Sequence, residues 1–199
     1  MPGVSGRRLF DVTTAAVMLV PAAPILALSA IAIKLDDGGP VFYRQTRVGK
    51  DGRDFELLKL RTMVVGAETL GAGYAVNRGD ARITRTGRIL RKLSFDELPQ
   101  LWNIVRGEMS VVGPRPTLRY QVDRYDERQL HRLDVKPGLT GWAQIHGRAT
   151  LPWAERIELD LWYVDHRSAR VDATILWRTP LALFGGTYKG ESGGWTSSD

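Results

Sequence analysis

The chain contains no cysteine and only three histidines among its 199 residues. The absence of cysteine excludes disulfide bonds and metal sites built on thiolates. The histidines (His131, His146 and His166) are scattered, and no two of them have the spacing of a metal-binding pair. This pattern disfavours a zinc enzyme.

Charge is absent from a long segment near the N-terminus. No acidic or basic side chain lies between Val12 and Ile33, and ~20 apolar residues are enough to cross the hydrocarbon core of a bilayer. Pro21 and Pro24 interrupt this run. A proline inside a helix removes a backbone hydrogen bond and favours a bend. We therefore expect a bent membrane helix.

Basic residues flank this segment on both sides. Arg7 and Arg8 precede it and Lys34 follows it, whereas a helix that spans the bilayer keeps its basic flank on the cytoplasmic side only. The pattern predicts a re-entrant helix, which enters the membrane, turns at the prolines and leaves by the same face. On this interpretation residues 1–34 form a membrane-embedded segment.

Three other interpretations of the segment stay open. A straight transmembrane anchor is one, since such helices tolerate proline. A cleaved signal peptide is another, because Ala30 and Ala32 resemble a small-residue cleavage site, although the apolar core exceeds the usual ~7–15 residues. A buried core helix is the third, and the length of the run disfavours it.

The remainder has the length of a single domain, which we place at residues 35–184, followed by a loose tail rich in glycine and serine at 185–199. The chain holds 28 Lys and Arg against 22 Asp and Glu, which gives a formal net charge of +6. Such an excess suits polyanionic partners, namely phospholipid headgroups, nucleotides or nucleic acid.

Periodic patterns predict an α+β domain. Strands are expected at 41–48 and 54–61, joined by a turn at Asp51 and Gly52, which makes a β-hairpin. Several amphipathic helices are expected, at 85–92, 98–105, 117–133 and 151–164. Residues 175–184 are expected to lie either in the core or at a membrane interface.

Six cations are candidates for binding phosphate. Alternation along the second strand places Lys59 and Arg61 on one face. Helical spacing over 85–92 places Arg88 and Arg91 near one another, although a solvated or lipid-facing basic stripe gives the same spacing. Arg115 lies between Pro114 and Pro116, which pre-orders its guanidinium for phosphate; the alternative is a rigid turn. Lys136, at the start of a glycine-rich loop, completes the set as a sixth candidate.

Adjacent carboxylates follow the basic run, at Asp96 and Glu97. A purely structural interpretation exists, because Ser94 and Glu97 fit a capping box ahead of an apolar helix. Asp96 also fits as the cap itself, since Pro99 is best tolerated in a first helical turn.

The surrounding cations favour a chemical role for the pair. Cations neutralise phosphate oxygens, so a carboxylate can approach phosphorus. Asp96 could then act as a nucleophile and form an acyl phosphate. Two neighbouring carboxylates also suit Mg²⁺, which binds one or two carboxylates together with substrate phosphates.

With these motifs the chain resembles the monotopic phosphoglycosyl transferases, the bacterial sugar transferase family. The resemblance covers residues 7–180, and its motifs occur in family order. They are Arg8-Leu9-Phe10-Asp11, Gly39-Pro40-Val41-Phe42-Tyr43-Arg44-Gln45, Lys59-Leu60-Arg61-Thr62-Met63, residues 91–103 around Asp96-Glu97-Leu98-Pro99, residues 107–116 ending in Gly113-Pro114-Arg115-Pro116, and Lys136-Pro137-Gly138-Leu139-Thr140-Gly141-Trp142-Ala143-Gln144.

The resemblance implies a ping-pong transfer of a sugar 1-phosphate from a UDP-sugar to polyprenyl phosphate. By position it makes Asp96 the nucleophile, Glu97 its dyad partner and Mg²⁺ the cofactor, held by this dyad. Lys59, Arg91 and Arg115 match the basic residues around the phosphates, and Pro24 matches the helix-breaking proline. Ala23 replaces the family's frequent serine before that proline, and Glu108 stands where aspartate is common.

The resemblance also implies location and partners. It places the protein on the cytoplasmic face of a bacterial inner membrane, in contact with phospholipids and without a nucleic-acid partner. Trp-rich surfaces and the C-terminal segment are compatible with a homodimer. The rival from another class is a membrane-tethered basic adaptor that binds anionic lipid or nucleic acid without catalysis.

Overall fold

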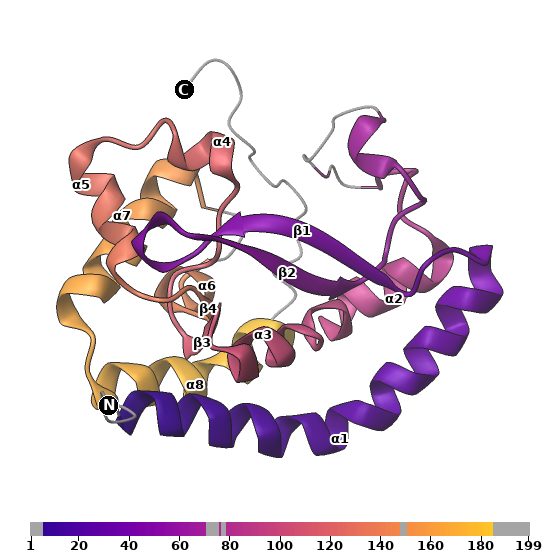
Figure 1. Cartoon of the computed structure of the whole chain (residues 1–199), viewed down its shortest axis with the longest axis horizontal. Helices are drawn as coiled ribbons and strands as arrows, with labels where there is room; N and C mark the ends of the chain where they lie inside the picture. The colour runs from indigo at the N-terminus through magenta and orange to yellow at the C-terminus, as the bar shows by residue number, and fades with distance from the viewer. Residues whose placement is uncertain (1–5, 71–75, 77–78, 148–150, 185–199) are drawn as a thin grey trace.

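The computed structural model describes residues 6–70, 76, 79–147 and 151–184. The architecture is α+β, as predicted. A two-stranded antiparallel hairpin crosses the molecule, a long N-terminal helix runs along one side of it, and shorter helices pack around both (Figure 1). The tail expected at 185–199 lies outside the described residues.

The N-terminal helix α1 (Gly6–Asp37) contains both prolines and is assigned as one helix. Its ribbon changes direction part-way along (Figure 1), and prolines are the usual cause of such a change. Its most apolar 18-residue window has a mean hydropathy of 2.3 and is only 17% buried. By length and composition α1 can cross a membrane. Its buried residues fall four or seven positions apart on one stripe: Asp11, Ala15, Ala22, Ser29 and Ile33.

The first turns of α1 are bonded to the middle of the chain. The Arg8 guanidinium donates to the carbonyls of Ile104 and Val105, at 2.5 and 2.6 Å. The buried Asp11 carboxylate accepts from the Ser110 hydroxyl at 2.8 Å and from the Val111 amide at 2.9 Å. These contacts fix the start of the helix to the domain.

The last turn of α1 is bonded to the same domain. Asp37 forms an ion pair with the buried Arg61 guanidinium. Asp36 accepts a hydrogen bond at 2.8 Å from the amide of Thr86, in the first turn of α2 (Arg85–Lys92). Both ends of the long apolar helix are therefore held by one domain.

The predicted hairpin is confirmed, with β1 at Phe42–Val48 and β2 at Asp54–Leu60. The 3₁₀ turn η1 (Lys50–Gly52) joins them, and Asp51 and Gly52 both have positive φ, at 57° and 73°. Such a left-handed pair matches the right-handed twist of the strands. Tyr43 lies opposite Lys59 in the antiparallel register.

Helix α3 (Gln100–Arg106) lies between α1 and β2. Leu101 and Ile104 are fully buried in the main core, to which α1, β2, β3, α7 and α8 contribute. The Asn103 amide bridges to the hairpin, because its Nδ2 donates to the Glu56 carbonyl at 2.7 Å and its Oδ1 accepts from the Leu58 amide at 3.0 Å. The predicted helix at 98–105 is thus confirmed within two residues.

A second, parallel strand pair joins two glycine-rich motifs, with β3 at Ser110–Val112 and β4 at Gly138–Thr140. The backbones approach so closely that a Cβ atom on Gly138 would lie 2.1 Å from the Gly113 nitrogen. A Cβ atom on Gly113 would lie 2.4 Å from the Lys136 carbonyl oxygen. Glycine is therefore required at both positions for the motifs to pair.

Most of the predicted helices are confirmed. Helix α2 has the expected bounds, and α7 (Trp153–His166) covers the stripe predicted at 151–164. Helix α8 (Ala169–Phe184) includes residues 175–184. Ile175 is fully buried in the core and Trp177 is 81% exposed, so a core role is confirmed and a membrane interface stays a prediction. The remaining short elements are η2 (Ala67–Thr69) and α6 (Trp142–Ile145).

The single helix predicted at 117–133 is wrong. The chain forms α4 (Arg119–Val122), α5 (Glu127–Leu130) and η4 (His131–Asp134) instead. Asp126 explains the break, because its extended backbone ends one segment while its carboxylate caps the next by accepting from the Gln129 amide at 2.7 Å. A capping aspartate inside a charged run is a helix start rather than a helix interior.

Candidate active site

Asp96 and Glu97 lie in the 3₁₀ turn η3 (Phe95–Glu97), between α2 and α3. Ser94 precedes the turn with a left-handed φ of 57°, an unusual conformation for serine. Its side chain caps no helix, and α3 begins after Pro99 without a side-chain cap. Both capping interpretations of the Ser94–Glu97 segment are therefore wrong.

Glu97 is held between two cations from distant parts of the chain. Its Oε1 accepts from Lys59 Nζ at 3.1 Å and from Arg115 Nη2 at 2.5 Å, while Arg115 Nη1 lies 3.4 Å from Oε2. The side chains of Lys59 and Glu97 are only 19% and 18% exposed. The structure thus brings three predicted site residues into one ion cluster, which we call the Glu97 clamp.

The Glu97 clamp sets the charge of its members. Burial alone would raise the pKa of Glu97, but Arg115 and Lys59 outweigh it and hold that pKa well below its usual range. Burial lowers the pKa of Lys59, and the Glu97 carboxylate opposes this change. Glu97 is accordingly a permanent anion that is already engaged by two donors.

The Asp96 carboxyl differs sharply from its neighbour. It is 7% exposed and makes no hydrogen bond or ion pair with another side chain among the residues that the structure describes. Burial raises the pKa of Asp96 to about 6; Lys59 and Arg91 oppose the increase, and the Glu97 charge adds to it. A basic carboxylate without competing donors is the better nucleophile of the two.

Two side chains near Asp96 carry buried donor atoms without an acceptor among the described residues. Arg91, within electrostatic reach of Asp96, has Nε and Nη1 buried without a hydrogen-bond partner in the described part of the chain. Gln100, one helical turn after Asp96, has its Nε2 in the same state. Buried donors are normally satisfied, so the Arg91 guanidinium in particular indicates a site for an anionic ligand. Sequence reasoning missed Gln100, which its four-residue spacing from Asp96 could have suggested.

Arg47 is a further cation that sequence reasoning missed. Burial and the nearby Arg115 charge lower the pKa of Arg47 to about 10, and the Glu97 carboxylate opposes this change. Its guanidinium donates to the Gln45 side-chain oxygen at 2.5 Å and to the Pro116 carbonyl at 3.1 Å. Strand alternation could have identified Arg47, because Tyr43 lies opposite Lys59 and every second residue of β1 from Tyr43 to Arg47 shares that face.

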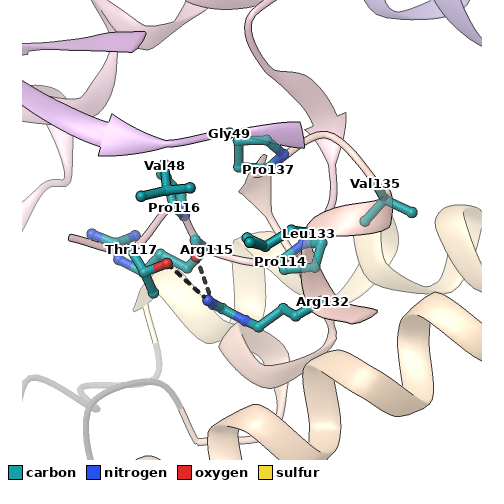
Figure 2. A pocket seen from close by; sticks show the side chains of 10 residues that line it. All are labelled: Val48, Gly49, Pro114, Arg115, Pro116, Thr117, Arg132, Leu133, Val135 and Pro137. Atoms are coloured by element: carbon teal, nitrogen blue, oxygen red, sulfur yellow. Dashed lines mark hydrogen bonds between the residues drawn. The ribbon is translucent and has the colours of Figure 1, made fainter. Parts of the chain in front are cut away.

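The loop that carries Arg115 is held by a buried ion pair. Arg132 Nη2 donates to the Arg115 carbonyl at 2.6 Å and Nη1 to the Thr117 hydroxyl at 3.2 Å, while Nη2 lies 2.7 Å from the Asp160 carboxylate. Figure 2 shows Arg132 extended beneath this loop. The cavity there, about 10 Å³, has room for no more than one water molecule. It supports the loop and is too small for a substrate.

Three predicted site residues lie elsewhere. Arg61 follows β2 and pairs with Asp37 at the end of α1. Arg88 is exposed on α2, in keeping with a solvated stripe. Lys136 lines a different cavity, together with residues from the start of α1. Pro21 and Pro24 lie inside α1, as expected.

The dyad suits a divalent cation only in part. No group of three or more His, Asp or Glu side chains able to hold a metal ion occurs within the described ranges. Mg²⁺ needs no such group, because it binds through one or two carboxylates and completes its shell with water and substrate phosphates. The Asp96 carboxylate is available for this, whereas Glu97 is engaged by Lys59 and Arg115.

The sequence was then compared with known proteins. A family model described as "Bacterial sugar transferase" matches residues 4–186. The "Uncharacterized sugar transferase EpsL" of Bacillus subtilis is 45% identical over 170 residues, which cover 85% of this chain and 83% of that protein. The "Exopolysaccharide production protein ExoY" of Rhizobium meliloti is 41% identical over 195 residues, with 91% and 86% covered. The "UDP-glucose:undecaprenyl-phosphate glucose-1-phosphate transferase" of Caulobacter vibrioides is 44% identical over 185 residues, with 89% and 69% covered.

The buried pair beneath the Arg115 loop yields a stability prediction. Arg132→Met leaves the buried Asp160 carboxylate uncompensated, so we expect the free energy of unfolding to fall by about 3–5 kcal/mol. Thermal and chemical unfolding of the purified protein in detergent measure this. Arg128→Met is the matched control, because Arg128 pairs with Glu158 on the exposed surface, and it should change nothing measurable. Equal stability of the two variants would contradict the assigned role of Arg132.

Proposed function

This chain belongs to the bacterial sugar transferase family, and on that premise we propose that it moves a sugar 1-phosphate from a UDP-sugar to polyprenyl (undecaprenyl) phosphate. Such a transfer starts the assembly of an exopolysaccharide or a related glycan. The observation that carries the proposal is a pair of buried Arg91 nitrogens, Nε and Nη1, without a hydrogen-bond partner among the described residues. They lie within electrostatic reach of Asp96, whose carboxylate makes no ion pair in the same part of the chain. A phosphate group supplies the acceptors that Arg91 lacks.

In the first half-reaction an oxygen of the Asp96 carboxylate attacks the β-phosphorus, which carries the sugar. A new O–P bond forms, the bond from that phosphorus to the bridging oxygen breaks, and UMP leaves with the bridging oxygen. Arg91 and the clamp cations Lys59 and Arg115 offset the phosphate charge as Asp96 approaches. Glu97 orders these two cations and does not compete as nucleophile, because both already bind it.

In the second half-reaction an oxygen of the polyprenyl phosphate attacks the same phosphorus. The bond to Asp96 breaks, the carboxylate is restored, and the lipid leaves with the phosphosugar. Each half exchanges one phosphate linkage for another, so positioning and charge compensation provide most of the catalysis. Bound Mg²⁺ would add charge neutralisation at the diphosphate. Asp96 is the carboxylate available to hold it, and Glu97 would join as the second ligand of the dyad only on release of Lys59 or Arg115.

A lipid acceptor requires the dyad to lie at headgroup level, and we assign that role to α1. Both ends of α1 are bonded to the catalytic domain, through Arg8 and Asp11 at the start and through Asp36 and Asp37 at the end. A helix held in this way suits re-entrant insertion, in which entry and exit share the cytoplasmic face of the inner membrane. Its outward apolar side chains would contact phospholipid, among them Val20, 74% exposed.

Replacement of the nucleophile tests the chemistry. In membranes supplied with UDP-sugar, polyprenyl phosphate and Mg²⁺, Asp96→Asn should lower the rate of UMP release by about 10³-fold or more, because no covalent intermediate can form. Asp123→Asn, which changes an exposed aspartate outside the site, should keep the wild-type rate. Mass spectrometry of the digested wild-type enzyme should find the phosphosugar on the peptide that carries Asp96. Full turnover by Asp96→Asn, or an adduct on another residue, would refute the assignment and favour the non-catalytic adaptor.

The raised pKa of Asp96 predicts an acid limit to the first half-reaction. Only the ionised carboxylate attacks. The rate of UMP release should therefore reach its maximum above about pH 7 and should fall as the pH drops through about 6. Lys59→Met removes a cation that lowers the pKa of Asp96, and the acid limb should therefore move to higher pH. Rapid-quench measurements of the wild type and of Lys59→Met, over a range of about three pH units around the pKa, check the acid limb and its shift. A limb that stays in place in Lys59→Met would contradict the electrostatic coupling.

Cysteine labelling tests the insertion of α1, since the chain has no native cysteine. Gly6→Cys lies at the start of α1, where a side chain meets nothing within 4 Å, and Arg53→Cys is exposed after the hairpin turn. An impermeant maleimide applied to the periplasmic side should label neither cysteine, and both should react once the inner membrane is permeabilised. Periplasmic labelling of Gly6→Cys alone would establish a spanning helix instead.

A further inference from the structure

A second group of cations surrounds a cavity that shares no lining residue with the dyad or the Glu97 clamp. The cavity has a volume of about 180 Å³. It lies between the start of α1, the hairpin turn η1, the segment before β4 and the connection from α7 to α8. Five basic side chains line it: Arg7, Arg8, Lys50, Lys136 and Arg167. We call it the basic cavity.

Both arginines at the start of α1 are fixed in place. Arg7 donates to the Tyr163 hydroxyl at 2.6 Å and to the Val112 carbonyl at 3.0 Å, and it pairs with Asp172 at 3.2 Å. Arg8 donates to two carbonyls in the last turn of α3. The cavity wall therefore presents positive charge in a fixed geometry.

The two carboxylates that line the cavity do not cancel this charge. Asp11 already accepts from the Ser110 hydroxyl and the Val111 amide. Asp134 is paired with the imidazole of His131. Arg7 is paired with Asp172 outside the lining, so four cations face the charges of Asp11 and Asp134, and a positive excess remains around the cavity.

Three of the cavity cations have no side-chain partner in the part of the chain that the structure describes. Neither Lys50 nor Lys136, nor the guanidinium of Arg167, makes a side-chain hydrogen bond or ion pair with any residue in the described ranges. Burial lowers the pKa of Lys136, and the nearby charges of Arg8 and Lys50 lower it further, against the opposing effect of Asp11. An anion placed between these cations would relieve their mutual repulsion.

We propose that the basic cavity binds a phosphate group. Fixed guanidinium groups provide geometry, and the unpaired lysines provide mobile charged donors, which is the combination that phosphate recognition uses. Two sources carry this chemistry, an acidic phospholipid headgroup and a small soluble phosphate. The start of the apolar helix forms one wall of the cavity, which favours the headgroup; that preference rests on the proposed insertion of α1, whereas phosphate binding itself does not.

Isothermal titration of the full-length protein with inorganic phosphate in detergent tests the proposal. We expect two binding sites in the wild type, the basic cavity and the dyad. In Lys50→Gln/Lys136→Gln, the site in the cavity should weaken by about tenfold for each charge-assisted hydrogen bond lost, while the dyad site is retained. Arg91→Gln/Arg115→Gln should give the reciprocal result, which separates a failure here from a failure of the proposed function.

Arg53→Gln is the matched control, because it removes one exposed cation next to the hairpin turn and outside the cavity. Its isotherm should equal that of the wild type. Arg167→Gln provides a second cavity variant in a connecting segment, in case the double lysine variant unfolds at a lower temperature. Isotherms of the cavity variants that superimpose on the wild type would overturn the proposal.

The same titration in nanodiscs identifies the source of the phosphate. If a headgroup occupies the cavity, phosphatidylglycerol in the disc should abolish phosphate binding at that site, whereas phosphatidylcholine alone should leave it. If the ligand is soluble, the affinity should be equal in both discs. Absence of the site in detergent and in both kinds of disc would overturn the proposal.

Discussion

The ion cluster around Glu97 is the constraint on which the site depends. It joins three segments that are far apart in the chain: the end of the hairpin, the turn η3 and the proline-bounded loop of Arg115. A buried carboxylate without partners is costly, so η3 can occupy this position only when both cations arrive. Assembly of the cluster and assembly of the site are consequently one event.

The cluster also separates the roles of two adjacent carboxylates. Glu97 receives both donors and stays ionised, while Asp96, one residue away, receives no side-chain donor from the described residues and has a raised pKa. Neighbouring acids in unlike environments commonly divide a reaction between them. In the proposed reaction this division makes Asp96 the nucleophile and leaves Glu97 to position Lys59 and Arg115.

The supports of the cluster are buried and were formed during folding. Arg132 and Asp160 hold the Arg115 loop from below, and Asn103 fixes the edge of β2 next to the segment of Lys59. Charges placed in this way need little rearrangement when a phosphate arrives, and such preorganisation is a main source of electrostatic catalysis.

Local patterns predicted the parts of the site that depend on local structure. The hairpin and α2 follow from turn residues and periodicity, and the clamp cations Lys59 and Arg115 were identified by strand alternation and by flanking prolines. The 3₁₀ turn of Asp96 and Glu97 was not predicted, because a helix cap was expected there. Arg61 shows the limit of this reasoning. By strand alternation Arg61 should lie on the same face as Lys59. It lies just past the end of β2, however, where Asp37 of α1 binds it.

Residues whose partners come from distant segments could not be assigned from sequence. Lys136 was predicted to bind phosphate at the active site. The β3–β4 pairing instead places it near Arg8 and away from Asp96. In the sequence Arg132 is one of many charged residues in its segment. Only the tertiary fold buries it beneath the Arg115 loop. Such contacts depend on how strands and helices meet, which no local spacing encodes.

Helix α1 relates these cation sites to the membrane. A straight helix of 32 residues would be about 48 Å long at 1.5 Å per residue, well beyond a hydrocarbon core of ~30 Å. If it spanned the bilayer, the partners of Arg8 and of Asp37 would lie on opposite sides, although both belong to one packed domain. A bend at the prolines removes that conflict. Helix α2, which precedes the dyad, contacts α1 near its C-terminal end. The basic cavity lies at the N-terminal end of α1. With α1 inserted as proposed, the two proposed phosphate-binding regions flank it, and both face the plane where lipid phosphates lie.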